Sequence, residues 1–154
     1  MNPEEFLANP PDSIIQYPNP ILTTVCKPIT DITPWRDILA IMYELMERFH
    51  GCGLAAPQVG LPYRAFITKV KSNLNFINPE ILEYGERTDT EKEGCLSIPE
   101  FHALITRPRK VKIRWTELNG KTRTAMFEGH TARVILHEND HLNGKLIIET
   151  ANKQ

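Results

Sequence analysis

The sequence of 154 residues has only three cysteines, almost no net charge and no long apolar run. Cys26, Cys52 and Cys95 are an odd number without regular spacing, which argues against a disulfide framework and for a reducing compartment. The formal net charge of -1 gives no general attraction to nucleic acid or to an anionic membrane. No segment approaches the ~18 apolar residues that a membrane-spanning helix needs. The composition is that of an ordinary soluble globular protein.

The N-terminal segment MNPEEFLANPPDS contains two glutamates and no apolar run, so it does not resemble a signal or transit peptide. We therefore expect a cytoplasmic protein with no membrane contact. The length is that of one domain, and the scattered prolines and glycines mark no linker or repeat. We expect residues 1–154 to form a single catalytic domain.

The clearest helix is predicted for residues 33–51, TPWRDILAIMYELMERFHG. Apolar residues recur there at three- and four-residue spacing, so one face should pack into the core. Thr33 can cap this helix, Pro34 suits its first position, and Gly51 follows as a stop signal.

Several other segments are typical of extended structure. Prolines in residues 13–22 favour an extended arm. Residues 64–70 and 74–82 are predicted strands, and Pro79 should end or bend the second. Residues 109–129 are predicted to form a hairpin around an Asn-Gly turn. Its basic residues are better explained as the solvated face of a strand than as a nucleic-acid site.

A second helix is predicted after Gly129, ending where Asn143 and Gly144 can adopt left-handed conformations. The tail, residues 145–154, is predicted to be a short strand that frays. Strands followed by a helix favour an α+β fold, with antiparallel sheets packed around this second helix and one longer helix near the N-terminus.

The second predicted helix contains the sequence HENDH, residues 137–141. Residues four apart lie on the same face of a helix, so His137 and His141 can bind one metal ion. Glu138 lies beside them, close enough to transfer a proton. A pair of histidines at this spacing is often only a solvated helix face, but the adjoining glutamate makes a catalytic metal site the better interpretation.

The residues alone leave the third metal ligand open. Glu149 is the single suitable residue downstream, and it lies in the tail that we expect to fray, so an upstream ligand is favoured. The candidates of suitable chemistry are Cys95, Cys52, Cys26, His50, His102 and His130.

Two further segments have unusual compositions. EGCLSIP, residues 93–99, places Cys95 after a glycine that permits close backbone approach, and Pro99 should end the segment. GCGLAAPQVG, residues 51–60, favours a loop whose backbone approaches a ligand, with the Gln58 amide as a hydrogen-bond donor. A tight connection between helix and strand would explain those glycines equally well.

Taken together, GCGLAAPQ, EGCLS and HENDH resemble the three motifs of the peptide deformylase family, in the same order. The flanking sequences YPNPIL, SIPE and DHLNG agree as well, so the resemblance extends from about Ile14 to Ile148. Coincidence of three such motifs is far less expected than coincidence of one.

The resemblance implies that Cys95, His137 and His141 hold one divalent metal ion per chain. Family members typically use ferrous iron, and zinc, nickel or cobalt can substitute. Metal-bound hydroxide would attack the formyl carbon of N-formyl-methionyl nascent peptides, with Glu138 as general acid and base, and formate would be released. The Gln58 side chain and the Leu96 backbone N–H would stabilise the oxyanion.

The resemblance also implies where the peptide binds. Glycines near the site would let an extended peptide lie against backbone edges, and Cys52 would form part of the groove wall rather than bind the metal. Glu93 is expected to form a buried ion pair with an arginine such as Arg107. The expected substrate-binding residues are Gly51, Cys52, Gly53, Glu93, Gly94, His130 and Val134.

The chain departs from the family pattern at several positions. Asn139 replaces an apolar residue but should point away from the metal. His130 replaces an apolar residue of the methionine pocket, unless it only caps the helix, and His102 replaces an arginine. The short tail leaves no room for the C-terminal helix that several members use to dock on the ribosome, so ribosome contact would be transient. We expect a monomer without a nucleic-acid site.

Two other classes of function remain as alternatives. A metallopeptidase or other amidase could use the same helix motif, but it would need a different third ligand and would cleave internal peptide bonds. A non-catalytic binding protein could retain the metal for structure, but such a site does not need Glu138 and usually has four protein ligands.

Overall fold

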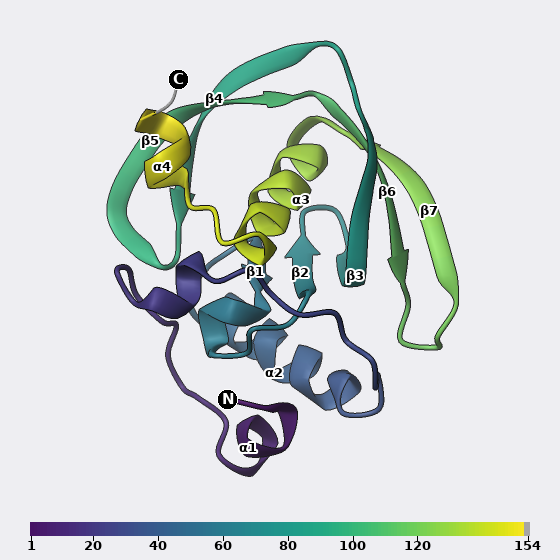
Figure 1. Cartoon of the computed structure of the whole chain (residues 1–154). Helices are drawn as coiled ribbons and strands as arrows, with labels where there is room; N and C mark the ends of the chain where they lie inside the picture. The colour runs from purple at the N-terminus through teal and green to yellow at the C-terminus, as the bar shows by residue number, and fades with distance from the viewer. Residues whose placement is uncertain (153–154) are drawn as a thin grey trace.

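Helix α3 (Gly129–Leu142) lies at the centre of the molecule, between two separate antiparallel sheets (Figure 1). The computed structural model describes residues 1–152. Five strands form one sheet in the order β1-β2-β3-β6-β7, and two strands, β4 and β5, form the other. The α+β prediction with antiparallel sheets around this helix is therefore confirmed.

The strands have the following bounds: β1 Gly53–Ala55, β2 Ala65–Lys69, β3 Asn73–Tyr84, β4 Thr88–Cys95, β5 Ile98–Pro108, β6 Lys110–Thr116 and β7 Thr122–Glu128. The other helices are α1 Pro3–Ala8, α2 Trp35–Arg48 and α4 Ile147–Asn152, with short 3₁₀ helices η1 Pro20–Thr23 and η2 Ala56–Val59. None of the helices among residues 1–152 is long and apolar enough to cross a membrane.

Two apolar clusters hold α2 and α3 against opposite faces of the five-stranded sheet. On one face, the apolar side of α2 packs on Leu54, Ile67 and Ile77. On the other, Ile135 and Leu136 of α3 pack among aromatic residues from β2, β3 and β6. Successive residues of a strand point to opposite faces, so the same short strands supply both clusters. This packing fixes α3 firmly.

Helix α2 ends at Arg48, one residue earlier than a stop at Gly51 would imply. It begins at Trp35, and its N-cap residue is Pro34, without a side-chain cap from Thr33. His50 adopts the left-handed conformation, with φ of 59°, and the Gly51 N–H donates to the Met46 carbonyl. The Schellman motif is therefore built around His50, and the prediction that Gly51 would be the stop residue is wrong by one position.

The predicted strands and hairpin are confirmed. Pro79 bends β3 and does not end it, because pairing with β6 shifts register between Ile77 and Glu80 and then continues. Asn78 has a φ of 49° at this bulge. The extended arm at residues 13–22 gives way to η1 at Pro20, since proline is tolerated at the first position of a helix.

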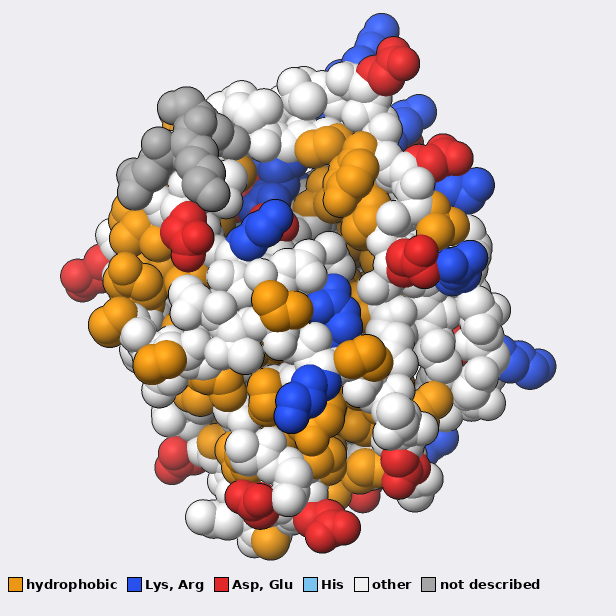
Figure 2. Space-filling model, viewed as in Figure 1, with side chains coloured by type: hydrophobic (Ala, Val, Ile, Leu, Met, Phe, Trp, Pro, Cys, Tyr) orange, Lys and Arg blue, Asp and Glu red, His pale blue; other side chains and the backbone are white. Residues whose placement is uncertain are grey.

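The basic residues of β6 each lie near a carboxylate on a neighbouring strand. Lys110 lies 3.6 Å from Glu128, and the Arg114 guanidinium lies 2.7 Å from Glu80. In the space-filling view, basic and acidic side chains lie side by side on the right of the molecule, where β3, β6 and β7 run (Figure 2). These acidic neighbours offset the positive charge of β6.

Several elements differ from the expectations. The β4–β5 hairpin was not predicted, and Pro99 lies inside β5 instead of ending the segment. The segment expected to be a loop forms β1 and η2, because β1 pairs with β2 in the five-stranded sheet. Helix α1 was also not predicted; the Asn2 side chain caps it by accepting a hydrogen bond from the Glu5 N–H.

The tail forms helix α4, so the prediction of a strand is wrong. Leu146 and Ile147 are buried against Ile105 of β5, and the Thr150 N–H donates to the Leu146 carbonyl. Packing on β5 therefore stabilises a short helix where we expected none. Lys153 and Gln154, the end of the predicted tail, lie outside the described residues.

Gly144 ends α3 in the left-handed conformation, with φ of 71°, and a Cβ there would lie 2.6 Å from the Thr23 carbonyl oxygen. We expect Gly144→Ala to lower the free energy of unfolding by more than about 2 kcal/mol, since both the conformation and the contact are unfavourable. Urea denaturation measures this loss.

Gly120→Ala is the matched control. Gly120 has a φ of 84°, but a Cβ there would meet no atom within 4 Å. This substitution should cost only the left-handed conformation, about 1–2 kcal/mol. Equal losses in the two variants would contradict the proposed contact with Thr23.

Candidate active site and metal centre

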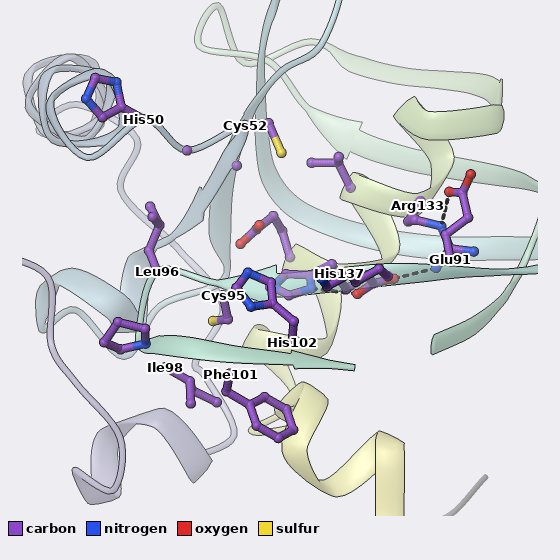
Figure 3. Close-up of a pocket in the computed structure, with 18 of the residues that line it drawn as sticks. His50, Cys52, Glu91, Cys95, Leu96, Ile98, Phe101, His102, Arg133 and His137 are labelled. Carbon is purple, nitrogen blue, oxygen red and sulfur yellow. Dashed lines mark hydrogen bonds and ion pairs between the residues drawn. The ribbon is translucent and has the colours of Figure 1, made fainter. Parts of the chain in front are cut away.

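Cys95, His137 and His141 lie together where β4 meets α3. Their ligand atoms all lie within 4.8 Å of one another, and the Cys95 Sγ is 3.5 Å from the His141 Nε2. Cys95 and His137 lie close together at the pocket in Figure 3. The two imidazoles lie one turn apart on α3, as their spacing predicted. One thiolate and two imidazoles suit iron or zinc, so these residues can hold a metal ion.

The second nitrogen of His137 is held by Glu93. The His137 Nδ1 lies 2.9 Å from the Glu93 Oε1, which leaves the Nε2 available for a metal. Burial by itself lowers the pKa of His137, but the Cys95 and Glu93 side chains outweigh burial and raise it. For His141, burial holds the pKa well below its usual range and favours the neutral imidazole.

Glu93 is the centre of a buried ionic network. Its carboxylate accepts hydrogen bonds from Arg107 of β5 at 2.6 and 3.0 Å and from Arg133 of α3 at 2.6 Å. Burial opposes ionisation, but the hydrogen bonds from His137 and Arg107 lower the pKa of Glu93 to about 2. The expected ion pair between Glu93 and Arg107 is confirmed, and Arg133 is an additional partner.

Glu138 is buried beside the three candidate ligands. One carboxylate oxygen, Oε1, has no hydrogen-bond partner among the described residues. Burial raises the pKa of Glu138 to about 7. A carboxyl group with such a pKa can accept and return a proton near neutral pH.

The Gln58 side chain is fixed next to Cys95. Its Oε1 accepts from the Ala55 N–H at 2.9 Å, and its Nε2 donates to the Ser97 Oγ at 3.0 Å. The same Nε2 lies 3.8 Å from the Cys95 Sγ. These contacts orient the amide so that its N–H₂ group points toward the site.

A cavity of about 1090 Å³ opens over these residues. The wall includes Leu96, Glu138 and the whole predicted set of substrate-binding residues: Gly51, Cys52, Gly53, Glu93, Gly94, His130 and Val134. A Cβ on Gly94 would lie 2.9 Å from the His102 ring, so this glycine leaves room for the ring of its partner across the hairpin. The cavity can accommodate an extended peptide segment.

The other candidates for the third ligand lie outside the cluster that could hold a metal. Cys26 is buried in the apolar cluster against α3, and its backbone N–H donates to the Leu142 carbonyl. His50, His102 and His130 line the cavity, as does Cys52. In Figure 3, the Cys52 side chain points into the pocket.

Arg133 and Ser97 belong to the site, although the sequence motifs did not indicate a role for either residue. Arg133 stands four residues before His137, so the same spacing that selected the histidines places it on their face of α3. Ser97 follows the cysteine motif and holds Gln58. Asn139 is buried on a different side of α3 from His137 and His141, as expected from the helical period.

Gly53 makes room for the catalytic candidate Glu138. A Cβ on Gly53 would lie 2.5 Å from the Glu138 Oε2 and 2.9 Å from its Cδ. We expect Gly53→Ala to displace this carboxylate and to lower the free energy of unfolding by about 1–3 kcal/mol. Denaturant titration measures the loss, and a crystal structure of the variant locates the carboxylate.

Gly51→Ala is the matched control for this substitution. A Cβ on Gly51 would lie 2.6 Å from the Leu96 Cδ1, the end of a flexible side chain that can rotate away. The loss should therefore be smaller than for Gly53. If the Glu138 carboxylate keeps its position in Gly53→Ala, the expected clash between a Cβ at residue 53 and this carboxylate would be contradicted.

Comparisons with known proteins agree on one family. A sequence profile of the family described as "Polypeptide deformylase" matches residues 11–154. The chain is 42% identical over 135 residues to a peptide deformylase from Thermotoga neapolitana, covering 86% of this chain and 82% of that protein. It is 39% identical over 137 residues to one from Treponema pallidum, covering 88% of this chain and 85% of that protein.

Solved structures agree with this result. A crystal structure of peptide deformylase from Thermotoga maritima superposes with a TM-score of 0.87 at 39% identity, covering 89% of this chain and 95% of that chain. A peptide deformylase from Synechococcus elongatus, solved with actinonin, gives a TM-score of 0.89 at 32% identity, covering 94% and 80%.

Proposed function

Because the chain belongs to the peptide deformylase family of metal-dependent hydrolases, we propose that its catalytic centre is the cluster formed by Cys95, His137, His141 and Glu138. The substrate would be an N-formyl-methionyl nascent peptide, and the products formate and a free amino terminus. The observation that carries the assignment is that the ligand atoms of Cys95, His137 and His141 lie within 4.8 Å of one another. Glu138 lines the adjoining cavity.

Cys95, His137 and His141 would hold one divalent metal ion, with ferrous iron as the native metal and zinc, nickel or cobalt able to substitute. When bound, such an ion would acidify a water molecule and polarise the formyl oxygen. Three protein ligands are typical of a catalytic site, whereas structural zinc usually has four. Glu93 supports the set by fixing the orientation of the His137 ring.

Glu138 would take a proton from the attacking water and later deliver it to the leaving amine. Its place next to His137 on α3, in the cavity wall, and the space that Gly53 leaves for the carboxylate support this role. Its Oε1, which has no hydrogen-bond partner among residues 1–152, would remain available for the proton transfer.

Gln58 and the backbone N–H of Leu96 would stabilise the negative charge on the formyl oxygen. The hydrogen bonds from Ala55 and to Ser97 hold the Gln58 amide in place before a substrate arrives. Loss of one such donor typically costs about 2.7–4 kcal/mol of transition-state stabilisation.

The peptide would lie extended across the cavity, against the backbone around Gly51, Gly53 and Gly94. Recognition of main-chain groups suits an enzyme that accepts many sequences. Cys52 would contribute to one wall of the groove, and His130 and Val134 to the wall that receives the first side chain.

We further propose that the protein acts as a cytoplasmic monomer that meets nascent peptides at the ribosome only transiently. The formal net charge of -1 supports the transient contact with the ribosome, because it provides no general attraction to ribosomal RNA.

Formate release from formyl-Met-Ala by anaerobically purified protein tests the proposed reaction. We expect Glu138→Gln to keep one metal ion per chain while turnover falls about 10²–10⁴-fold, because the acid–base group is lost. Metal content is measured by mass spectrometry, and cleavage of an unformylated peptide is measured in parallel.

Glu149→Gln is the control, because Glu149 is exposed on α4 and lies outside the candidate site. Its turnover and metal content should match those of the unmodified chain. Full activity of the Glu138 variant would refute the acid–base assignment, and cleavage of the unformylated peptide would indicate a metallopeptidase.

A further inference from the structure

One row of side chains on β4 faces one row on α3, and the candidate metal ligands stand at the same end of both rows. The row on β4 consists of every second residue: Asp89, Glu91, Glu93 and Cys95. The row on α3 consists of every fourth residue: Arg133, His137 and His141. Alternate residues of a strand are about 6.6–6.8 Å apart, and residues four apart on a helix are about 6.0 Å apart, so the rows stay nearly in step from Asp89 to Glu93. The pairing of β4 with β5 shifts register between Gly94 and Cys95, at the end of the row.

The contacts follow the two rows in order. Arg133 contacts Asp89, Glu91 and Glu93, His137 contacts Glu93, and His141 contacts Cys95. The strand and the helix therefore run in the same direction, joined by polar side chains. A shift of the strand along the helix would change every one of these contacts, including the separation of the thiol from the imidazoles.

Arg133 forms ion pairs with three residues of β4. Its guanidinium lies 2.9 Å from Asp89, 2.8 Å from Glu91 and 2.6 Å from Glu93. The Arg133 side chain is only 6% exposed, whereas those of Asp89 and Glu91 are 43% and 54% exposed. Figure 3 shows Arg133 and Glu91 joined at the side of the pocket. A planar guanidinium can bond several carboxylates at once, which a lysine ammonium does less well.

We propose that Arg133 is a positioning residue for the metal site: it fixes the register of β4 against α3 and thereby the separation of Cys95 from His137 and His141. The proposal rests on the metal site of the proposed function. Arg107 also joins this sheet to α3, since it lies 2.6 Å from Glu93 and 3.0 Å from Asp140 of α3, but it approaches from β5, the neighbouring strand of the same sheet. Arg133 approaches from the helix that carries both imidazoles.

Release of Co²⁺ from the loaded protein to an excess of a chromogenic chelator tests this role without measuring catalysis. We expect Arg133→Met to release Co²⁺ about 10-fold faster. Loss of a residue that supports the metal ligands typically weakens metal binding about 10- to 100-fold, and this expectation is the lower end of that range. The thiolate-to-cobalt absorption band should also weaken, because the sulfur is no longer held in place. A purely structural role would lower thermal stability and leave the absorption band of the folded protein unchanged.

Two arginine variants serve as controls. Arg123→Met removes an exposed arginine that pairs with Glu117 on the β6–β7 hairpin, and it should leave Co²⁺ release unchanged. Arg133→Lys keeps the charge but not the fork of donors, so it should recover only part of the loss. Full recovery with lysine would contradict a role in setting register, since charge alone would then suffice.

A second variant covers the case in which Arg133→Met does not fold. Asp89→Asn combined with Glu91→Gln removes two half-exposed partners and leaves the buried charges intact. We expect Co²⁺ release to become about 2- to 5-fold faster, as for the loss of exposed ion pairs. Unchanged release and an unchanged absorption band in the folded variants would overturn the proposal. An unmodified chain that binds no Co²⁺ would contradict the metal site itself.

Discussion

The buried carboxylate of Glu93 is the interaction on which the arrangement of the site depends. It connects β4 with Arg107 of β5 and with Arg133 and His137 of α3. Both arginines and Glu93 are at most 7% exposed. Removing one member of such a network leaves an uncompensated buried charge, which costs about 3–5 kcal/mol. The buried apolar residues of β5, Ile98 and Ile105, pack with Leu22, Leu146 and Ile147 and not with α3. The ionic network therefore supplies the link between this sheet and α3.

Helix α3 can carry the site because its two sides are held by different forces. Ile135 and Leu142 pack on the five-stranded sheet, and the row from Arg133 to His141 faces β4. Apolar packing fixes the helix, and the polar row positions the neighbouring sheet relative to it. Gly53 completes this arrangement, because only a residue without a side chain leaves space for Glu138.

The elements that could be predicted are those that depend on residues close together in the sequence. The period of α2, the Asn-Gly turn of the β6–β7 hairpin and the spacing of the two histidines needed no knowledge of distant residues. Strand β4, TDTEKEGC, has no alternating apolar residues, because its partners are the arginines of β5 and α3. Helix α4 likewise depends on burial against β5. The role of Arg133 could not be predicted in the same way, because its partners lie about 40 residues away in the sequence. Its four-residue spacing from His137 indicated only that it shares a face of the helix.

X-ray absorption spectroscopy of the anaerobically loaded protein tests the central assignment most directly. We expect one sulfur and two imidazole nitrogens around the metal. The sulfur should be lost in Cys95→Ser and kept in Cys26→Ser. A metal environment without sulfur, a sulfur that persists in the Cys95 variant, or a fourth protein ligand would contradict the assignment of Cys95, His137 and His141 as the metal ligands.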